Sequence, residues 1–290
     1  TLNGKKATGN EKLSAGDQIK LFLSDETFSK FSQQEQTARA VTALDIIYED
    51  SDILLINKPA GMLSQPDDTK EPSLVEYLIG YLLQNGSLTE NDLRTFHPSV
   101  CNRLDKNTSG IIAAGKSLAG LQELSALFHD RTVHKDYLCI VKGIITRPQH
   151  IHGYLHKDTS LNKVTVLQNK TRDTQPIETQ YTPLCHNTDA TLLKVRLITG
   201  RTHQIRAHLA SEGHPLAGDT KYGHPEFNRY FRDHYGLKHQ FLHAYRLTFP
   251  KLDGRLHDLS EKHFEADLSM QFQHILKEEH LEENYYENLE

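Results

Sequence analysis

Asp105 is the residue of this sequence whose surroundings point most directly to chemistry. It lies in the stretch RLDKNTSG, residues 103–110, with Arg103 two positions before it and small hydroxyl and amide side chains after it. Side chains of this kind bond to nearby backbone groups and hold a turn. A neighbouring guanidinium favours the ionised carboxylate, which could then act as a nucleophile or a base. The structural alternative is an aspartate that only caps N–H groups of the turn.

The residues that follow, Gly110 to Ser117, match the phosphate-binding pattern G-x-x-x-x-G-K-[ST]. A loop of that kind follows a buried strand and wraps a phosphate with its backbone N–H groups. Here polar, turn-forming residues precede the pattern, and its middle residues, Ile111 to Ala114, themselves have the composition of a strand. Because the order of strand and turn is reversed, a nucleotide-dependent ATPase is the less favoured hypothesis.

Histidines are numerous, 18 in all, but their spacing does not indicate a metal site. His203 and His208 lie in one predicted helix, where five residues separate two side chains by about 140°. The zinc pattern H-E-x-x-H needs an offset of four so that both rings meet one ion. Asp219 could in principle join them, but hydrogen-bonding or surface histidines are the expectation, and no metal is expected.

The length of 290 residues allows one large domain or two. The chain has no apolar run of about 18 residues and no charged-then-apolar leader, so neither a membrane span nor a signal peptide is expected. It begins without a methionine, which is compatible with a missing N-terminal piece. Three widely spaced cysteines predict reduced thiols and a cytoplasmic protein.

Charge is distributed unevenly along the chain. Residues 251–290 hold 4 of the 33 basic and 11 of the 38 acidic residues, so the remaining 250 residues are close to neutral. Residues 94–147, around Asp105, contain 8 basic and 4 acidic residues. This locally positive segment could hold phosphates or could be an ordinary solvated surface.

Periodicity predicts many strands and few helices. Asn3-Gly4 followed by alternating residues predicts a small hairpin over residues 2–23. Helices are predicted at residues 73–85 with Ser73 as N-cap, at 117–129, and at 203–213 where Gly213 ends the helix. Strands are predicted at residues 46–48, 53–56, 111–114, 137–141, 163–167, 177–182, 191–198 and 241–249. This pattern predicts an α+β fold with a mixed, mostly antiparallel sheet and flanking helices.

The stretch NRLDKNTSG, residues 102–110, resembles the H-R-L-D-x-x-T-S-G signature of the RluA-type RNA pseudouridine synthases. Three other blocks are similar to motifs of that family in the same order: residues 57–61 to its N-K-P-x-G loop, 134–137 to its K-x-Y segment, and 200–208 with 213–215 and 218–219 to its third motif. The resemblance covers roughly residues 43–260. One departure is Asn102, where the family has histidine, which puts in doubt how the aspartate loop is supported.

The resemblance implies a reaction that isomerises a uridine of RNA to pseudouridine, with no metal and no cofactor. Asp105 would be the essential carboxylate, which either attacks the sugar or removes a sugar proton. Arg206 matches the family's arginine that pairs with this aspartate. Tyr137 matches the tyrosine that stacks on the displaced base and can help to remove its proton.

The resemblance also implies a set of substrate contacts. Ile205 would pack on the base, and Arg103 would enter the RNA stack where the uridine flips out. Phosphate contacts are expected from Lys58, Lys135 and Arg201. His203 of the third motif completes the expected substrate-binding residues.

The expected domain organisation follows from the same comparison of motifs. Residues 1–24 are similar to the end of a ribosomal-protein-type RNA-binding module whose first helices are missing, and residues 25–42 are a linker. Residues 43–275 form the catalytic domain and residues 276–290 an acidic tail. The leading module and the aromatic, basic segment 222–240 favour ribosomal RNA as partner, with transfer RNA as the alternative. The protein is expected to be a monomer, and an RNA-binding protein without catalysis is the remaining hypothesis.

Overall fold

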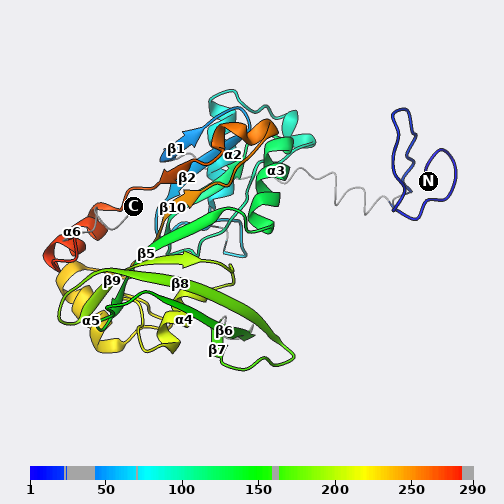
Figure 1. Cartoon of the computed structure of the whole chain (residues 1–290). Helices are drawn as coiled ribbons and strands as arrows, with labels where there is room; N and C mark the ends of the chain where they lie inside the picture. The colour runs from blue at the N-terminus through cyan, green and yellow to red at the C-terminus, as the bar shows by residue number, and fades with distance from the viewer. Residues whose placement is uncertain (23, 25–42, 70, 159–162, 283–290) are drawn as a thin grey trace. The chain divides into compact units, whose positions relative to one another are not determined.

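The computed structural model describes residues 1–22, 24, 43–69, 71–158 and 163–282. The chain divides into two compact units, Thr1–Ala38 and Arg39–Glu290 (Figure 1). In the first unit, Asn3 and Gly4 form the expected turn with φ values of 48° and 76°, and Leu2 bridges to Lys5 and Ile19. The predicted linker, residues 25–42, lies outside the described residues.

Eleven strands form one sheet in the described part of the second unit. The order is β1-β2-β4-β10-β5-β9-β8-β6-β7, with β3 paired to β4 and β11 paired to β10. Among these pairs, β10 with β4 is parallel and the others are antiparallel. The strands are β1 Ile46–Glu49, β2 Ile53–Lys58, β3 Ser99–Val100, β4 Ser109–Gly115, β5 His134–Lys142, β6 Gln149–Asp158, β7 Lys163–Leu167, β8 Thr174–His186, β9 Ala190–Leu197, β10 Leu242–Thr248 and β11 His263–Glu265. The predicted α+β fold with a mixed, mostly antiparallel sheet is confirmed.

Helices flank this sheet (Figure 1). They are α2 Leu74–Gln84, α3 Leu118–His129, α4 Gln204–Ser211, α5 Pro225–Tyr235 and α6 Met270–Glu278, with short 3₁₀ turns η1 Asp92–Arg94 and η2 Gly254–Leu259. The helices predicted at 73–85, 117–129 and 203–213 correspond to α2, α3 and α4, whereas α5 and α6 were not predicted. In the described part of the chain, no helix combines the length and the apolar character needed to span a bilayer.

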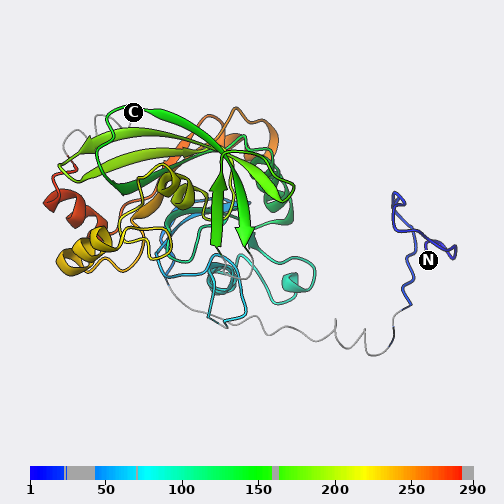
Figure 2. The ribbon, with the colours of Figure 1, turned by 90° about the horizontal axis from the view of Figure 1, so that it is seen from below.

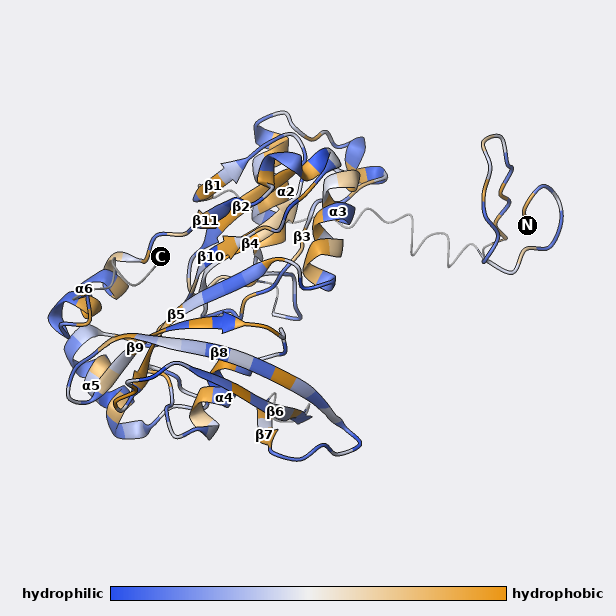
Figure 3. Cartoon of the chain, viewed as in Figure 1, coloured by the Kyte–Doolittle hydropathy of each residue, from blue (hydrophilic) through white to orange (hydrophobic). Residues whose placement is uncertain are grey.

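Strand β2 shows why the centre of the sheet is apolar on both faces. Leu54 and Ile56 pack in one buried cluster together with Leu74 and Leu78 of α2. The alternate residues Ile53 and Leu55 join Leu124 of α3 in a second cluster. Figure 3 shows the corresponding hydrophobic colour in β2 and β4. Because helices cover both faces, these strands read as continuous apolar runs rather than as alternating ones.

Helix α6 packs beside α5 at one end of the sheet (Figure 1, Figure 2). Phe272 of α6 stacks on Phe241 with ring centroids 3.9 Å apart. Leu276 and Leu281 are also buried in this cluster. Helix α6 therefore crosses the boundary expected between residues 275 and 276, and the beginning of the acidic tail packs against the domain.

The phosphate-loop pattern forms a strand and the start of a helix. Strand β4 spans Ser109–Gly115, and Ser117 is the N-cap of α3 and accepts a hydrogen bond from the N–H of Gly120. The Lys116 ammonium lies 2.6 Å from Glu49 Oε1 and donates to the carbonyl of Asp50. The arrangement agrees with the predicted turn-then-strand order and leaves no loop of free N–H groups for a phosphate.

Gly110 is expected to be irreplaceable where the parallel strands β4 and β10 meet. Its φ is +112°, and a Cβ built on it would lie 2.1 Å from the carbonyl oxygen of Ala244. Gly110→Ala should lower the free energy of unfolding by about 3 kcal/mol or more, because the strained φ and the backbone clash add. Chemical denaturation measures this loss, with Gly200→Ala as control, since nothing lies within 4 Å of a Cβ at Gly200. Equal stability of the two variants would contradict the expectation.

Candidate active site

A cleft of about 1310 Å³ brings together most of the residues that the sequence singles out. Its floor contains Asp105 and Arg206, and side chains from β5, α4 and the loops around them form its walls. The predicted residues that line it are Arg103, Asp105, Lys135, Tyr137, Arg201, His203, Ile205 and Arg206. Lys58 is the one predicted site residue that does not line the cleft.

The Asp105 turn is held by the loop that follows β2. Lys106 accepts at its carbonyl oxygen from the N–H of Gly61 at 2.8 Å, and Ser64 Oγ both donates to Leu104 O at 2.7 Å and accepts from Leu104 N at 3.1 Å. Within the turn, the N–H of Thr108 donates to Asp105 O at 2.9 Å. The backbone on each side of Asp105 is therefore fixed by hydrogen bonds, as a preorganised carboxylate requires.

Lys58 requires a correction, because it was expected to contact phosphate. Its side chain is buried, and the ammonium donates to the carbonyls of Pro59, Met62 and Lys106 at 2.9, 2.9 and 3.1 Å. An ammonium has three donors, so none remains for a phosphate. Burial lowers the pKa of Lys58 to about 7, while the charge of Asp105 acts in the opposite direction. Lys58 therefore supports the Asp105 turn from behind.

Asn102 ties the start of the turn to strand β4. Its Nδ2 donates to Ile111 O at 3.2 Å, and its Oδ1 accepts from the N–H of Ala113 at 2.8 Å. A side-chain amide can both donate and accept in this way. The replacement of the family's histidine by Asn102 thus leaves the turn attached to the sheet.

The residues after the turn attach it to strand β10. Ser109 Oγ lies 2.8 Å from His243 Nδ1, and His243 Nε2 lies 3.0 Å from Ala266 O. Because a carbonyl can only accept, Nε2 carries the proton and Nδ1 accepts from the serine hydroxyl. Burial lowers the pKa of His243 to about 4, so the ring stays neutral and the hydrogen bonds keep this direction.

Arg206 bridges two carboxylates, because a planar guanidinium has enough donors to bind both at once. Its Nη1 donates to Asp105 Oδ2 at 2.8 Å. Its Nε and Nη2 donate to the two oxygens of Asp219 at 2.7 and 2.9 Å. Burial alone would lower the pKa of Arg206, but the two carboxylates outweigh burial and raise it. Arg206 is therefore a fixed cation beside Asp105.

Asp219, which belongs to the third motif and was weighed only as a metal ligand, anchors Arg206. Its carboxylate is fully buried and also accepts from the N–H groups of Lys221 and Tyr222 at 2.8 and 3.0 Å. Burial alone would raise the pKa of Asp219, but the hydrogen bonds and charge of Arg206 outweigh it and the pKa is lowered. The signal for this role was the Gly218-Asp219 pair of the third motif.

His203, the N-cap residue of α4, also approaches Asp105. Its Nε2 is 3.8 Å from Asp105 Oδ2, and its Nδ1 is 3.0 Å from the hydroxyl of Tyr222. The same hydroxyl accepts from the N–H of Val164 at 2.9 Å, and its own proton has a partner among these contacts when it is donated to His203 Nδ1. The neutral ring then carries its proton on Nε2, facing Asp105. Burial lowers the pKa of His203, with Asp105 opposing this shift and Arg206 adding to it.

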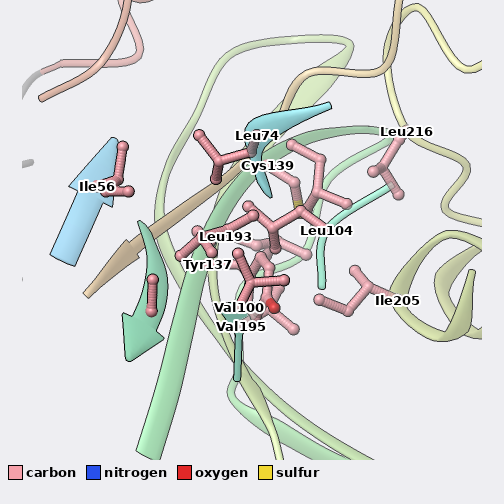
Figure 4. Close-up of a cluster of buried hydrophobic side chains, with 14 of the residues drawn as sticks. Ile56, Leu74, Val100, Leu104, Tyr137, Cys139, Leu193, Val195, Ile205 and Leu216 are labelled. Atoms are coloured by element: carbon pink, nitrogen blue, oxygen red, sulfur yellow. The ribbon is translucent and has the colours of Figure 1, made fainter. Parts of the chain in front are cut away.

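Tyr137 and Ile205 form the apolar side of the cleft. Tyr137 lies on β5 between β10 and β9, opposite Ala244 and Val195. Figure 4 shows Tyr137, Ile205 and Leu104 in one cluster of buried side chains. Burial, with the charges of Asp105 and Asp136, raises the pKa of Tyr137, so the phenol keeps its proton. A flat, apolar surface beside a carboxylate suits a nucleobase held by stacking.

The rim of the cleft is positively charged. Arg103 is exposed there, Lys135 and Arg201 are largely covered, and the buried Nε of Arg201 has no hydrogen-bond partner among the described residues. Burial and the nearby Arg131 lower the pKa of Lys135. Other basic residues of the cleft are Lys106, Arg131, Lys157 and Lys221. Such a rim is suited to a polyanion.

Residues 52–211 match the family model described as RNA pseudouridylate synthase. The chain is 32% identical to an uncharacterized RNA pseudouridine synthase of Mycoplasma pneumoniae, over 95% of this chain and 86% of that one. It is 30% identical to ribosomal large subunit pseudouridine synthase D of Zymomonas mobilis (78% and 69% covered) and 30% identical to synthase C of Vibrio vulnificus (86% and 75% covered).

A solved structure supports the fold. Human RNA pseudouridylate synthase domain containing 4 superposes with a TM-score of 0.62 at 22% identity, covering 80% of this chain and 91% of the human chain. The matched family segment contains both Asp105 and Arg206, the two residues that the cleft pairs at 2.8 Å. The chain belongs to the RNA pseudouridylate synthase family.

Proposed function

We propose that this RNA pseudouridine synthase modifies specific uridines of ribosomal RNA, acting as a cytoplasmic monomer whose catalytic domain begins at residue 43 and includes the whole of α6. The observation that carries the catalytic part is the ion pair of Asp105 with Arg206, at 2.8 Å, in a cleft with a basic rim. The names of the relatives from Zymomonas mobilis and Vibrio vulnificus, ribosomal large subunit pseudouridine synthases, support the choice of RNA.

Asp105 is the group that acts on the ribose. The reaction breaks the bond from the sugar to a ring nitrogen and forms a bond from the sugar to a ring carbon, so the product is an isomer and needs no co-reactant. Asp105 can serve by attacking the sugar or by removing a sugar proton, and either role requires an ionised carboxylate. Arg206 keeps it ionised and aimed, because its other two donors are fixed on Asp219.

The walls of the cleft hold the displaced base. A uridine inside a stack is out of reach, so it must flip out, and we expect the exposed Arg103 to occupy the gap. Tyr137 and Ile205 provide the surface on which the base stacks. The proton on the new sugar-linked carbon has to leave. The Tyr137 phenol, protonated and close to Asp105, can relay that proton rather than accept it outright, and the ring nitrogen released from the sugar takes up one proton, so the product remains an isomer.

Tyr222 is expected to influence catalysis through His203. Tyr222→Phe removes the hydroxyl that orients the imidazole, so Nε2 no longer keeps its proton toward Asp105. We expect turnover to fall roughly tenfold, the effect of one hydrogen bond of about 1.4 kcal/mol, with little change in KM. Single-turnover kinetics on an RNA fragment measure this. Tyr230→Phe is the matched control, because Tyr230 lies on α5 away from the cleft lining. Equal loss in both variants would contradict the assigned role.

Mapping of pseudouridines in total RNA tests the choice of substrate. We expect a strain that lacks the protein to lose pseudouridine at one or a few uridines of ribosomal RNA, detected by chemical tagging because the modification does not change mass. Re-expression of the wild type should restore these positions, and re-expression of Asp105→Asn should not. Losses confined to transfer RNA would overturn the proposed substrate but not the proposed reaction.

A further inference from the structure

Two histidines and a glutamate on neighbouring strands place three metal-ligating atoms together, outside the catalytic cleft. His150 and His152 lie on β6, and Glu178 lies on β8 directly opposite His152. One ligand atom of each residue is within 4.8 Å of the other two. His150 Nε2 is 2.7 Å from Glu178 Oε1, and the two imidazole rings have centroids 4.4 Å apart.

The pleat of β6 creates this arrangement. Side chains two residues apart point to the same face of a strand, so His150 and His152 project together while Ile151 is buried on the other face. Eight consecutive residue pairs between β6 and β8 fix the register that brings Glu178 opposite His152. The donors are therefore positioned by sheet hydrogen bonds rather than by a loop.

The donor set selects a class of metal ion. Two imidazole nitrogens and one carboxylate oxygen suit Zn²⁺, which takes three protein ligands and a water in tetrahedral geometry. Mg²⁺ and Ca²⁺ prefer oxygen ligands, so this set does not suit them. Ligands at about 2.0–2.1 Å from zinc lie roughly 3.3 Å apart. His150 and Glu178, 46% and 34% exposed, have to separate by less than 1 Å to reach that spacing.

We propose that His150, His152 and Glu178 form a zinc-binding site that cross-links β6 to β8. A hydrogen bond between His150 and Glu178 uses two of the three residues, and His152, placed beside them by the pleat and the register, adds the third donor that a zinc ion needs. The site is not part of the catalytic machinery. Leu155 of β6 and Gln175 of β8 line the cleft from the opposite face of the same two strands.

Zinc binding by the full chain tests the proposal. We expect one equivalent of Zn²⁺, supplied as the chloride, to be bound tightly enough to compete with a chromophoric chelator. His152→Ala should weaken this binding by at least about tenfold, and Glu178→Gln should also weaken it. Zinc at a hundredfold excess over the Kd of the wild type should raise the thermal midpoint of the wild type by roughly 5 °C, and that of His152→Ala by about half as much or less. Mg²⁺ should do neither.

His156→Ala is the matched control, because His156 is exposed on the same face of β6 but outside the triad. This variant should bind zinc as the wild type does. Unchanged zinc affinity in His152→Ala, or a loss in His156→Ala as large as in His152→Ala, would overturn the assignment. Activity should survive chelation by EDTA. Activity lost with EDTA and restored by zinc would overturn the separation of this site from catalysis.

Discussion

Asp105→Asn is expected to abolish pseudouridine formation, by at least about 10³-fold, while RNA binding and the fold persist. The asparagine has nearly the same shape but can neither attack the sugar nor remove a proton from it. Arg206 keeps both hydrogen bonds to Asp219, so the buried guanidinium is not left without a carboxylate. Chemical tagging of pseudouridine in a modified RNA fragment measures the loss, and filter binding measures the retained affinity.

Lys116→Ala is the control that separates this mechanism from nucleotide-dependent chemistry. Lys116 is the lysine of the phosphate-loop pattern, and its ammonium pairs with Glu49, outside the cleft. Activity should remain close to that of the wild type. If Lys116→Ala were inactive and the wild type bound ATP, the chemistry would have to be reassigned to the pattern at residues 110–117. If the wild type bound RNA without making product, it would be a binding protein.

Hydrophobic periodicity was sufficient to predict the helices and strands whose residues follow one simple pattern. The helices α2 and α3 each present one apolar face, and β7 has the β-branched composition of a strand. Strand β6 was not predicted, because its histidines and Gly153 obscure the alternation of apolar and polar residues, although Ile151 and Leu155 are buried. Helix α5 was missed because its segment is mostly polar, with Phe227 and Phe231 as its buried residues.

The residues of the site could be predicted where a sequence motif contains them. The role of a residue could not be predicted where it depends on neighbours that only the fold brings together. Asp105 and Arg206 lie 101 residues apart in the chain, so their pairing was expected from the family resemblance and not from any local pattern. Lys58 illustrates the opposite error. A lysine in a motif that resembles one of RNA-modifying enzymes suggests phosphate binding, but its three carbonyl partners come from a loop and a turn that only the fold brings together.

Arg206→Met is expected to damage both stability and catalysis, because it leaves the fully buried Asp219 without its cation. Breaking a buried ion pair by removing one partner costs about 3–5 kcal/mol. The loss of activity should be at least about 10²-fold, since Asp105 loses the group that aims it. Urea unfolding and single-turnover kinetics measure the two effects separately.

The double variant Arg206→Met/Asp219→Asn separates the two roles of the arginine. The asparagine keeps an oxygen for the N–H groups of Lys221 and Tyr222 but carries no charge, so no uncompensated ion stays buried. Most of the lost stability should return relative to Arg206→Met, whereas activity should stay low because Asp105 still lacks its partner. Recovery of both quantities together would mean that Arg206 acts only by stabilising the fold. Recovery of stability alone would show that the guanidinium acts on Asp105 directly, with Asp219 serving as the anchor that holds it there.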